Sequence, residues 1–335
     1  MMKAGWERMK EQISPDINTV RKMLMPFFEE DKVEYIEMLS GGLNNSNIKV
    51  TTSSNEDFVL RLYGSNNKSM KVECEIVKLL KGRVPVAEIV YSDSSCSVFQ
   101  SPFLLMKLVR GEQLSEMIYR ENAHEIRSAA AAAGAALAEI HKMKFPASGF
   151  FDDQLNIREY VEISASSFMA IMEEIYRRGY VSKHLGEKVC GNVLKFSQEH
   201  ACILDGPEEQ NFLVHSDFNP LNILVEEKDG SIKISAILDW EYAFSGPPLM
   251  DIGNMLRYEG IDTSMLMPFI LSYQENGGNL PDKWLQKAKL LDLIALFDLV
   301  DHEECGEVKV ADIKRLILSM MDEWESYGVI QNAFK

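Results

Sequence analysis

The segment HSDFNPLNILV, residues 215–225, joins a histidine, an aspartate and two asparagines to the start of an apolar strand. Asp217 and Asn222 are separated by four residues, and the sequence after them predicts a hairpin, NILVEE and KISAILDW, that turns at Asp229 and Gly230. This hairpin would bring Asn222 and Asp239 side by side at its open end. Two oxygen-bearing side chains with a carboxylate just upstream suit Mg²⁺, which takes few protein ligands together with a bound phosphate.

The same spacing, D-x-x-x-x-N followed by a hairpin and an aspartate, is the arrangement of kinase-type phosphoryl-transfer sites. In such sites one carboxylate accepts the proton of the substrate hydroxyl, and the other two groups hold metal. The spacing alone is weak support, because Asx residues before a strand usually just form turns. The elements that surround the motif therefore decide its meaning.

The first third of the chain predicts a small sheet with helices. Residues 14–30 predict a leading helix, with Ser14 as N-cap and Pro15 at the first helical position. Residues 34–64 alternate with period two and predict three antiparallel strands, residues 69–82 predict a helix, and residues 87–109 predict two or three further strands. We therefore expect a first lobe over residues 1–109.

After Gly111 the sequence becomes helical, with strong helix formers in AHEIRSAAAAAGAALAEIHKM and in most segments that follow. The hairpin that begins at Asn222 is the only strand pair predicted in this part. Residues 110–335 are thus expected to form a larger, mainly helical lobe. The predicted fold class is α+β, with two lobes of unequal size.

The segments LVHSDFNPLNILV and AILDWEYAFSGPPLMDIGNML resemble the catalytic loop and metal-binding segment of the aminoglycoside phosphotransferase and choline kinase-like family, which has the bilobal protein-kinase-like fold. The expected element order agrees with that family from about residue 33 to residue 257. Two departures are Ser216, where glycine is common, and Asn219, where histidine often occurs. Neither of these positions supplies a metal ligand in the family.

The resemblance implies a role for five residues of these segments. Asp217 would be the catalytic aspartate, and Asn222 and Asp239 would bind Mg²⁺ and complete the catalytic set. Asp251 would be a buried aspartate that supports the catalytic loop. His215 would orient the loop rather than act as a base.

The first lobe would then bind the nucleotide. Its third strand, FVLRLYG, offers Arg61 where lysine is usual, and Glu73 on the next helix is the expected partner, with Glu75 as second choice. The turn LSGGLNNSNIKV would cover the phosphates, and the segment before Gly111 would be the hinge that binds the base. The predicted nucleotide-binding residues are therefore Ser40, Gly41, Gly42, Asn45, Arg61, Glu73, Met106, Lys107, Leu108 and Val109. ATP is the default nucleotide by analogy, and GTP remains open.

The composition bears on the phosphate acceptor. The chain carries 35 basic and 51 acidic residues, a formal charge of −16, which opposes binding to nucleic acid or to an anionic membrane surface. The interval from Asp239 to Asp251 is too short for the activation segment of a protein kinase. We therefore expect a small, hydroxylated and cationic acceptor, with Glu241, Asp298 and Asp301 as candidate substrate residues beside Asp217.

Two further expectations come from segments that the sequence lacks. No stretch of about 18 uninterrupted apolar residues occurs, and the first residues do not resemble a secretory signal. The five cysteines are scattered and form no C-x-x-C pair, so neither disulfides nor a zinc site is predicted. These features favour a cytoplasmic location.

Three functions remain as alternatives. The first is an aminoglycoside kinase, and the second is a kinase for choline, ethanolamine, homoserine or a sugar. The third is a kinase-like binding or structural protein without turnover. The presence of Asp217, Asn222 and Asp239 together favours the two enzymatic alternatives, which the sequence does not separate.

Overall fold

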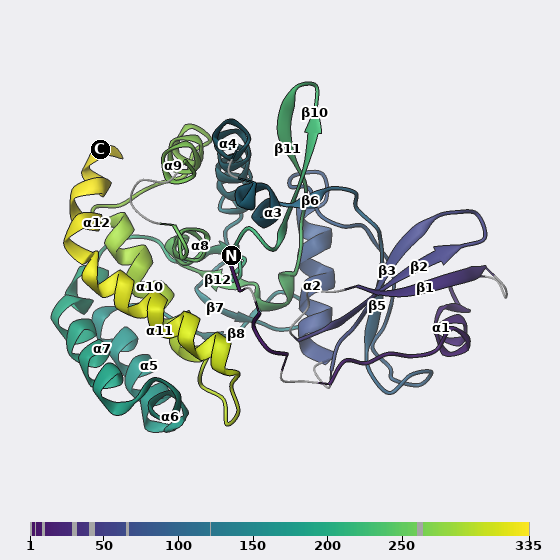
Figure 1. Cartoon of the computed structure of the whole chain (residues 1–335), viewed down its shortest axis with the longest axis horizontal. Coiled ribbons are helices and arrows are strands. Elements are labelled where there is room, and N and C mark those ends of the chain that lie inside the picture. The colour runs from purple at the N-terminus through teal and green to yellow at the C-terminus, as the bar shows by residue number, and fades with distance from the viewer. Residues whose placement is uncertain are drawn as a thin grey trace.

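The computed structural model describes residues 2–3, 5–8, 11–28, 32–39, 44–64, 67–120, 122–259 and 264–334. Figure 1 shows two lobes, one built on an antiparallel sheet and one mainly of helices. The predicted α+β class with a smaller sheet lobe first and a larger helical lobe second is confirmed.

The first lobe is a five-stranded antiparallel sheet with the order β1-β2-β3-β5-β4. The three strands predicted over residues 34–64 and the helix after them are present, whereas the segment 96–100 forms bends rather than a strand. The elements of this lobe are α1 (Ile17–Leu24), β1 (Val33–Leu39), β2 (Ser46–Thr52), β3 (Asp57–Leu62), α2 (Asn67–Leu80), β4 (Ile89–Asp93) and β5 (Phe103–Lys107).

The leading helix starts later than its sequence suggests. Asp16, rather than Ser14, is the N-cap, and its carboxylate accepts a hydrogen bond from the backbone N–H of Thr19 at 2.9 Å. Pro15 therefore precedes the helix instead of opening it. Asp and Ser are comparable capping residues, and the sequence placed both within one turn of the helix start.

The chain leaves the first sheet after Lys107 and reaches β6 (Glu112–Gln113), which pairs with the central hairpin of the second lobe. The predicted boundary at residue 109 falls within this connection. Gly111 has φ +148°, and a Cβ atom there would lie 2.5 Å from Ser235 Oγ and 2.9 Å from the carbonyl oxygen of Val225. A glycine is needed here because the connection passes directly against the hairpin.

The second lobe consists mainly of helices, as Figure 1 shows. They are α3 (Leu114–Tyr119), α4 (Ala123–Ile140), α5 (Ala165–Arg177), α6 (Tyr180–Leu185), α7 (Glu187–His200), α8 (Leu249–Met255), α9 (Leu266–Glu275), α10 (Trp284–Asp298), α11 (Glu307–Asp322) and α12 (Trp324–Ile330), with short 3₁₀ turns η1 (Ala201–Leu204), η2 (Trp240–Tyr242) and η3 (Gln331–Phe334). Among the described residues, no helix is both long and apolar enough to cross a membrane.

The second lobe also contains strands beyond the predicted pair. The hairpin is β10 (Ile223–Lys228) with β11 (Ser231–Ile237), and its turn has positive φ at Asp229 and Gly230, as the sequence predicts. The additional strands are β7 (Gly149–Phe151), β8 (Ile157–Tyr160), β9 (Phe212–Val214) and β12 (Phe244–Gly246), which form a second small sheet. The expectation of a single strand pair was wrong because segments of three or four residues are too short to show a period-two pattern.

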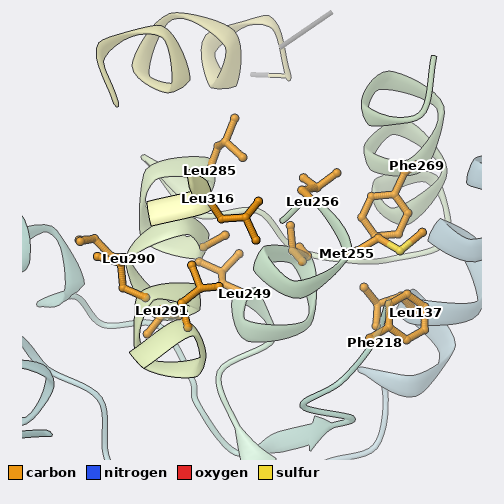
Figure 2. Packing of buried hydrophobic residues seen from close by; sticks show 14 of the residues in the cluster. Leu137, Phe218, Leu249, Met255, Leu256, Phe269, Leu285, Leu290, Leu291 and Leu316 are labelled. Atoms are coloured by element: carbon orange, nitrogen blue, oxygen red, sulfur yellow. The ribbon is translucent and has the colours of Figure 1, made fainter. Parts of the chain in front are cut away.

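The main hydrophobic core lies within the helical lobe. Figure 2 shows part of it, including Leu137 from α4, Phe218 from the predicted catalytic loop, and Leu290 and Leu291 from α10. Phe218 is fully buried in this core, directly after Asp217. The packing of Phe218 anchors the loop to the rigid part of the lobe and limits the movement of its polar residues.

Candidate active site

The β10–β11 hairpin positions the predicted metal ligands. Ile223 pairs with Ile237, and the backbone N–H of Leu238 donates to the carbonyl oxygen of Asn222 at 2.8 Å. Asn222 and Asp239 therefore flank the open end of the hairpin, as the sequence predicts. Asp239 has φ +68°, a left-handed conformation that aspartate tolerates better than most residues.

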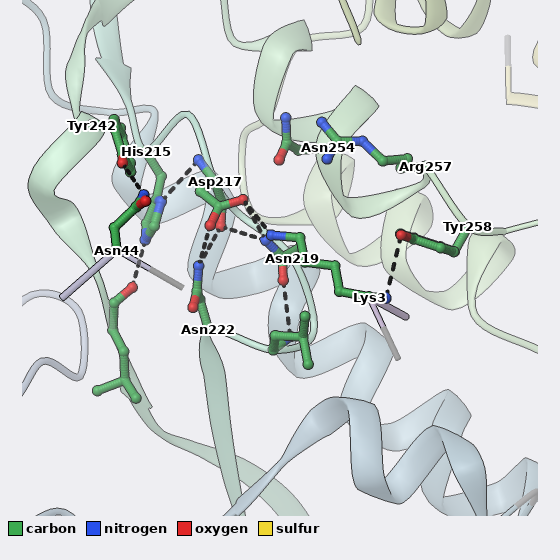
Figure 3. A network of polar contacts seen from close by, with 12 residues as sticks. Lys3, Asn44, His215, Asp217, Asn219, Asn222, Tyr242, Asn254, Arg257 and Tyr258 are labelled. Carbon is green, nitrogen blue, oxygen red and sulfur yellow. Dashed lines mark hydrogen bonds and ion pairs between the residues drawn. The ribbon is translucent and has the colours of Figure 1, made fainter. Parts of the chain in front are cut away.

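Two side-chain amides hold Asp217 in place (Figure 3). Nδ2 of Asn222 donates to Oδ2 of Asp217 at 2.8 Å and to its backbone oxygen at 2.9 Å. Nδ2 of Asn219 donates to Oδ1 of Asp217 at 2.7 Å and to the same backbone oxygen at 3.0 Å. Sequence reasoning treated Asn219 only as a departure from the family pattern, whereas the structure gives it direct contact with the carboxylate.

Asp251 lies beneath the loop and is fully buried. Its carboxylate accepts the backbone N–H groups of His215 and Ser216, both at 2.8 Å, and lies 3.3 Å from Nε2 of His141. Ser216 has φ +69°, a left-handed conformation that glycine adopts without steric strain. The ring of His215 bonds to backbone groups: Nε2 lies 2.9 Å from the carbonyl oxygen of Leu238, and Nδ1 accepts the N–H of Asp217 at 3.2 Å.

Arg61 joins the two lobes. Its Nη1 donates to Oε1 of Glu73 at 2.8 Å and to Oδ1 of Asp239 at 3.1 Å. Its Nε donates to Oδ1 of Asn47 at 3.2 Å, and the hydroxyl of Tyr63 donates to Glu73. Arg61 is 6% exposed and Glu73 is 3% exposed, so this ion pair is buried. Glu75 instead pairs with Lys78 on the exposed face of α2.

The charges around Arg61 are not balanced. Burial alone would lower the pKa of Arg61, but the carboxylates of Glu73 and Asp239 raise it well above its ordinary value. Burial raises the pKa of Glu73, and Arg61 only partly opposes this rise. Burial and the neighbouring Asp239 carboxylate raise the pKa of Glu241 to about 7. The carboxyl groups of Glu73, Asp239 and Glu241 thus surround a single guanidinium, and this excess of acidic groups favours binding of an additional cation.

The donor atoms at the hairpin's open end fit Mg²⁺. Because Nδ2 of Asn222 faces Asp217, the amide oxygen of Asn222 points away from the aspartate, as Figure 3 shows. Oδ1 of Asp239 accepts a hydrogen bond from Arg61, which leaves Oδ2 as a second metal-ligating oxygen beside the amide oxygen of Asn222. A carboxylate oxygen and an amide oxygen are hard ligands, and Mg²⁺ completes its shell with water and phosphate oxygens. Within the described ranges no cluster of three or more His, Cys, Asp or Glu side chains forms a metal site.

The predicted hinge lies between the two lobes. Met106 and Lys107 end β5, and the backbone N–H of Leu108 donates to the carbonyl oxygen of Asp57 at 3.1 Å. Met106 and Val109 belong to an apolar cluster that also contains Leu238, next to Asp239. Ser40, Gly41 and Gly42, the predicted phosphate-covering turn, lie outside the described residues. Asn45, which follows that turn, is buried and its side chain bonds to Glu241.

The predicted acceptor residues separate into two groups. Glu241 lies beside Asp239 and Asn45, and near Glu73 and Arg61. Asp298 ends α10 and its side chain is exposed, although the surrounding protein and Asp301 raise its pKa. Asp301 is buried and pairs with Nη1 of Arg178 at 2.7 Å, so it supports the α5–α10 contact and leaves Asp298 as the accessible member of the pair.

Sequence reasoning missed the N-terminal residues. Nζ of Lys3 lies 3.4 Å from Oδ1 of Asp217, and the backbone N–H of Lys3 donates to the hydroxyl of Tyr258 at 3.3 Å. Figure 3 shows Lys3 reaching toward Asp217 from the side opposite Asn222. No sequence pattern in this short polar segment indicates such a contact, because a single lysine carries no spacing signal.

Comparison with known proteins assigns the family. The sequence profile described as "Phosphotransferase enzyme family" matches residues 36–284, and no curated protein matches the chain. Among solved structures, a thermostable mutant of aminoglycoside phosphotransferase APH(4)-Ia has a TM-score of 0.64 at 16% identity, covering 90% of this chain and 98% of that one. A putative aminoglycoside phosphotransferase from Ralstonia eutropha JMP134 has a TM-score of 0.64 at 15% identity, with coverages of 93% and 98%.

A third similar structure, the ADP-bound form of APH(2'')-Ib, has a TM-score of 0.60 at 17% identity and covers 92% of this chain and 99% of that one. At these identities the solved structures establish the shared fold. The sequence profile covers most of the chain, including the hairpin, the loop before it, Arg61 and its partners Glu73 and Asp239. The chain belongs to the phosphotransferase enzyme family.

Proposed function

We propose that the protein is a small-molecule kinase that transfers the γ-phosphoryl group of ATP to a hydroxyl group of a small cationic acceptor. The observation that carries this proposal is the geometry of Asp217. Two amides fix both of its carboxylate oxygens, and one of those amides belongs to Asn222, whose own oxygen faces the proposed metal position. The base and the metal ligands are thus held in one rigid unit.

Asp217 acts on the acceptor. The hydroxyl oxygen of the acceptor attacks the γ-phosphorus, the bond to the β–γ bridging oxygen breaks, and the hydroxyl proton passes to the carboxylate of Asp217. The hydrogen bonds from Asn219 and Asn222 orient this carboxylate before the acceptor arrives. Asp251 accepts hydrogen bonds from the backbone of His215 and Ser216, and so fixes the position of the loop that carries Asp217.

The nucleotide lies between the hinge and Arg61. Arg61 supplies a guanidinium for the α and β phosphates, and Glu73, Tyr63 and Asn47 fix its orientation. The apolar cluster with Met106, Val109 and Leu238 supports the base. Bound to Asn222 and Asp239, Mg²⁺ would neutralise the charge that develops on the phosphate oxygens. GTP is the alternative nucleotide, because hinge backbone groups bind either base.

A cationic acceptor is supported by two observations. The chain has a formal charge of −16, which attracts cations to its clefts. In addition, the acceptor side of Asp217 already accommodates a primary ammonium group, that of Lys3. Aminoglycosides, choline, ethanolamine and aminosugars all carry a hydroxyl group near a cationic nitrogen.

The test is nucleotide consumption by the purified protein with Mg²⁺, using ATP and GTP separately against a panel of aminoglycosides, choline, ethanolamine, homoserine and aminosugars. We expect turnover on one of these compounds, and we expect Asp217→Asn to abolish it while nucleotide affinity stays within about threefold of the original. Loss of nucleotide binding together with turnover would instead assign Asp217 a structural role. Nucleotide binding without turnover on any compound would favour the non-catalytic alternative.

A further inference from the structure

An N-terminal segment runs across the acceptor side of the site. We call its described residues, Met2, Lys3 and Gly5–Arg8, the N-terminal strap. In Figure 1 the chain starts between the two lobes, near the centre of the molecule, and passes along the helical lobe before it reaches α1 in the sheet lobe. The strap therefore contacts residues of both lobes that are far from it in sequence, Asp217 among them.

Anchors on the helical lobe fix the start of the strap. Trp6 is buried against the main core, and its Nε1 donates to Oδ2 of Asp312 on α11 at 3.1 Å. The hydroxyl of Tyr258 donates to the same oxygen at 2.7 Å and accepts the backbone N–H of Lys3 at 3.3 Å. Asp312 thus ties together the strap and the segment that follows α8.

Two further contacts continue toward the sheet lobe. The carboxylate of Glu7 accepts the first backbone N–H groups of α11, from Val308 at 2.9 Å and from Lys309 at 3.2 Å. Such groups at a helix N-terminus lack partners within the helix, so Glu7 acts as a cap from outside it. Arg8 then donates to the backbone oxygen of Asn45 at 3.0 Å and to Oγ of Ser46 at 3.2 Å, at the start of β2.

Lys3 is the part of the strap that enters the site. Its ammonium lies 3.4 Å from Oδ1 of Asp217, and only 17% of the Lys3 side chain and 23% of the Asp217 side chain are exposed. Oδ2 of Asp217 accepts from Asn222, and Oδ1 accepts from Asn219 and lies beside Lys3, so Lys3 occupies one approach to this carboxylate. An acceptor hydroxyl must reach this carboxylate to lose its proton.

We propose that the N-terminal strap is autoinhibitory: Lys3 occupies the position of the acceptor at Asp217, and the acceptor must displace it for transfer to occur. This inference rests on the proposed role of Asp217 as the base. The ammonium of Lys3 lies where the acceptor hydroxyl must approach Asp217, so the acceptor competes with Lys3 directly. The capping contact of Glu7 and the burial of Trp6 keep the strap attached while its first residues move.

The contact that must break is weak, which makes displacement feasible. Ion pairs between partly exposed side chains contribute little to stability, and salt screens them further. Removing the Lys3 ammonium is therefore expected to raise the rate of nucleotide hydrolysis with water as acceptor by about fivefold, the ratio that such a pair contributes. High salt should also raise the hydrolysis rate of the unaltered protein, because it screens the ion pair. It should have less effect on a variant that lacks the Lys3 ammonium.

The experiment compares Mg²⁺-dependent ATP hydrolysis by the full chain with that of Lys3→Ala and Lys3→Met, with water as the only acceptor. Lys195→Ala, on α7, is the matched control because its side chain is 77% exposed and pairs with Glu199 on the same helix. A rise in both Lys3 variants and none in the control supports autoinhibition. An unchanged or lower rate overturns it, and a lower rate would make Lys3 a part of the acceptor site instead.

A second readout does not depend on turnover. Acetylation of lysines by an amine-reactive ester, followed by mass spectrometry, reports how well each ammonium is protected. Lys3 should react at least about threefold more slowly than Lys195, and Asp217→Asn should remove most of this difference. Equal rates for the two lysines in the unaltered protein would show that Lys3 does not occupy the site, and would overturn the inference.

The two proposals can fail separately. If Asp217→Asn removes hydrolysis in both the Lys3→Ala and the unaltered background, the proposed function stands, and the Lys3→Ala rate alone decides the role of the strap. If hydrolysis survives Asp217→Asn, the proposed function fails. The strap then cannot inhibit transfer by blocking Asp217, even if slow acetylation shows that Lys3 lies against this residue.

Discussion

Arg61 and Asp239 are 178 residues apart in the chain, yet Nη1 of Arg61 lies 3.1 Å from Oδ1 of Asp239. The same nitrogen binds both carboxylate oxygens of Glu73, at 2.8 and 3.1 Å. One guanidinium therefore connects β3, α2 and the end of the β10–β11 hairpin. The two lobes meet through this contact at the point where we place the phosphates and the metal.

The first prediction concerns the identity of this cation. Arg61→Lys keeps the positive charge but loses the bond from Nε to Asn47 and the planar geometry that holds Glu73. We expect the KM for nucleotide to rise by about tenfold while kcat changes less, because the charge for phosphate remains. Steady-state kinetics measure both parameters. Arg120→Lys, at an exposed ion pair with Glu112, is the control, and an unchanged nucleotide KM in Arg61→Lys would contradict the prediction.

The second prediction concerns Asn219. Asn219→Ala removes the hydrogen bonds to Oδ1 and to the backbone oxygen of Asp217, so the carboxylate gains freedom to turn away from the acceptor. We expect kcat to fall by about 10- to 100-fold with little change in nucleotide affinity. Kinetics with the identified acceptor, together with nucleotide titration, separate the two effects. Asn276→Ala, at the end of α9, is the control. A parallel loss of nucleotide affinity would indicate that the loop itself had collapsed.

The central motif could be predicted from the sequence because its geometry is local. Asn222 and Asp239 belong to one hairpin, and the Asp229–Gly230 turn fixes the register that brings them together. The pair of Arg61 and Glu73 also lies within a short stretch, on a strand and the helix that follows it. In each case a spacing along the chain translates directly into a distance in space.

Other parts could not be predicted because they depend on tertiary contacts. Lys3 meets Asp217 across 214 positions of the chain, and nothing in the spacing of either residue encodes that contact. Asp301 looked like a member of an acidic cluster, but its partner Arg178 lies 123 positions away on another helix. Glu241 interacts with Asn45 and Arg61 only because the first lobe folds against the second.

The third prediction concerns the connection between the lobes. Gly111→Ala forces a side chain into a left-handed backbone conformation and places Cβ 2.9 Å from a backbone oxygen of β10. Gly82 also has a positive φ, of +79°, but a Cβ atom there would meet no atom within 4 Å, which makes Gly82→Ala the comparison. We expect the first change to lower the free energy of unfolding by about 2–4 kcal/mol and the second by about 1 kcal/mol. Urea denaturation measures both, and equal losses would show that the connection can move away from the hairpin.

The fourth prediction concerns the pH dependence of stability. Lys289 on α10 is buried, and its ammonium donates to the backbone oxygen of Leu256 at the end of α8. Burial lowers the pKa of Lys289 from 10.5 to about 8, although Asp292 opposes the shift. Between these two values the unfolded chain binds a proton that the folded protein does not, so this residue makes the free energy of unfolding rise with pH across that window.

Lys289→Met removes the titrating group. From about pH 7.5 to about pH 9.5, the free energy of unfolding of the unaltered protein should therefore rise by about 2 kcal/mol relative to that of the variant. Urea denaturation at the two pH values gives the double difference, in which the titration of all other groups cancels. Lys195→Met, with its exposed side chain, should behave like the unaltered protein. A double difference near zero for Lys289→Met would mean that the buried lysine stays charged throughout, held by Asp292 despite its burial.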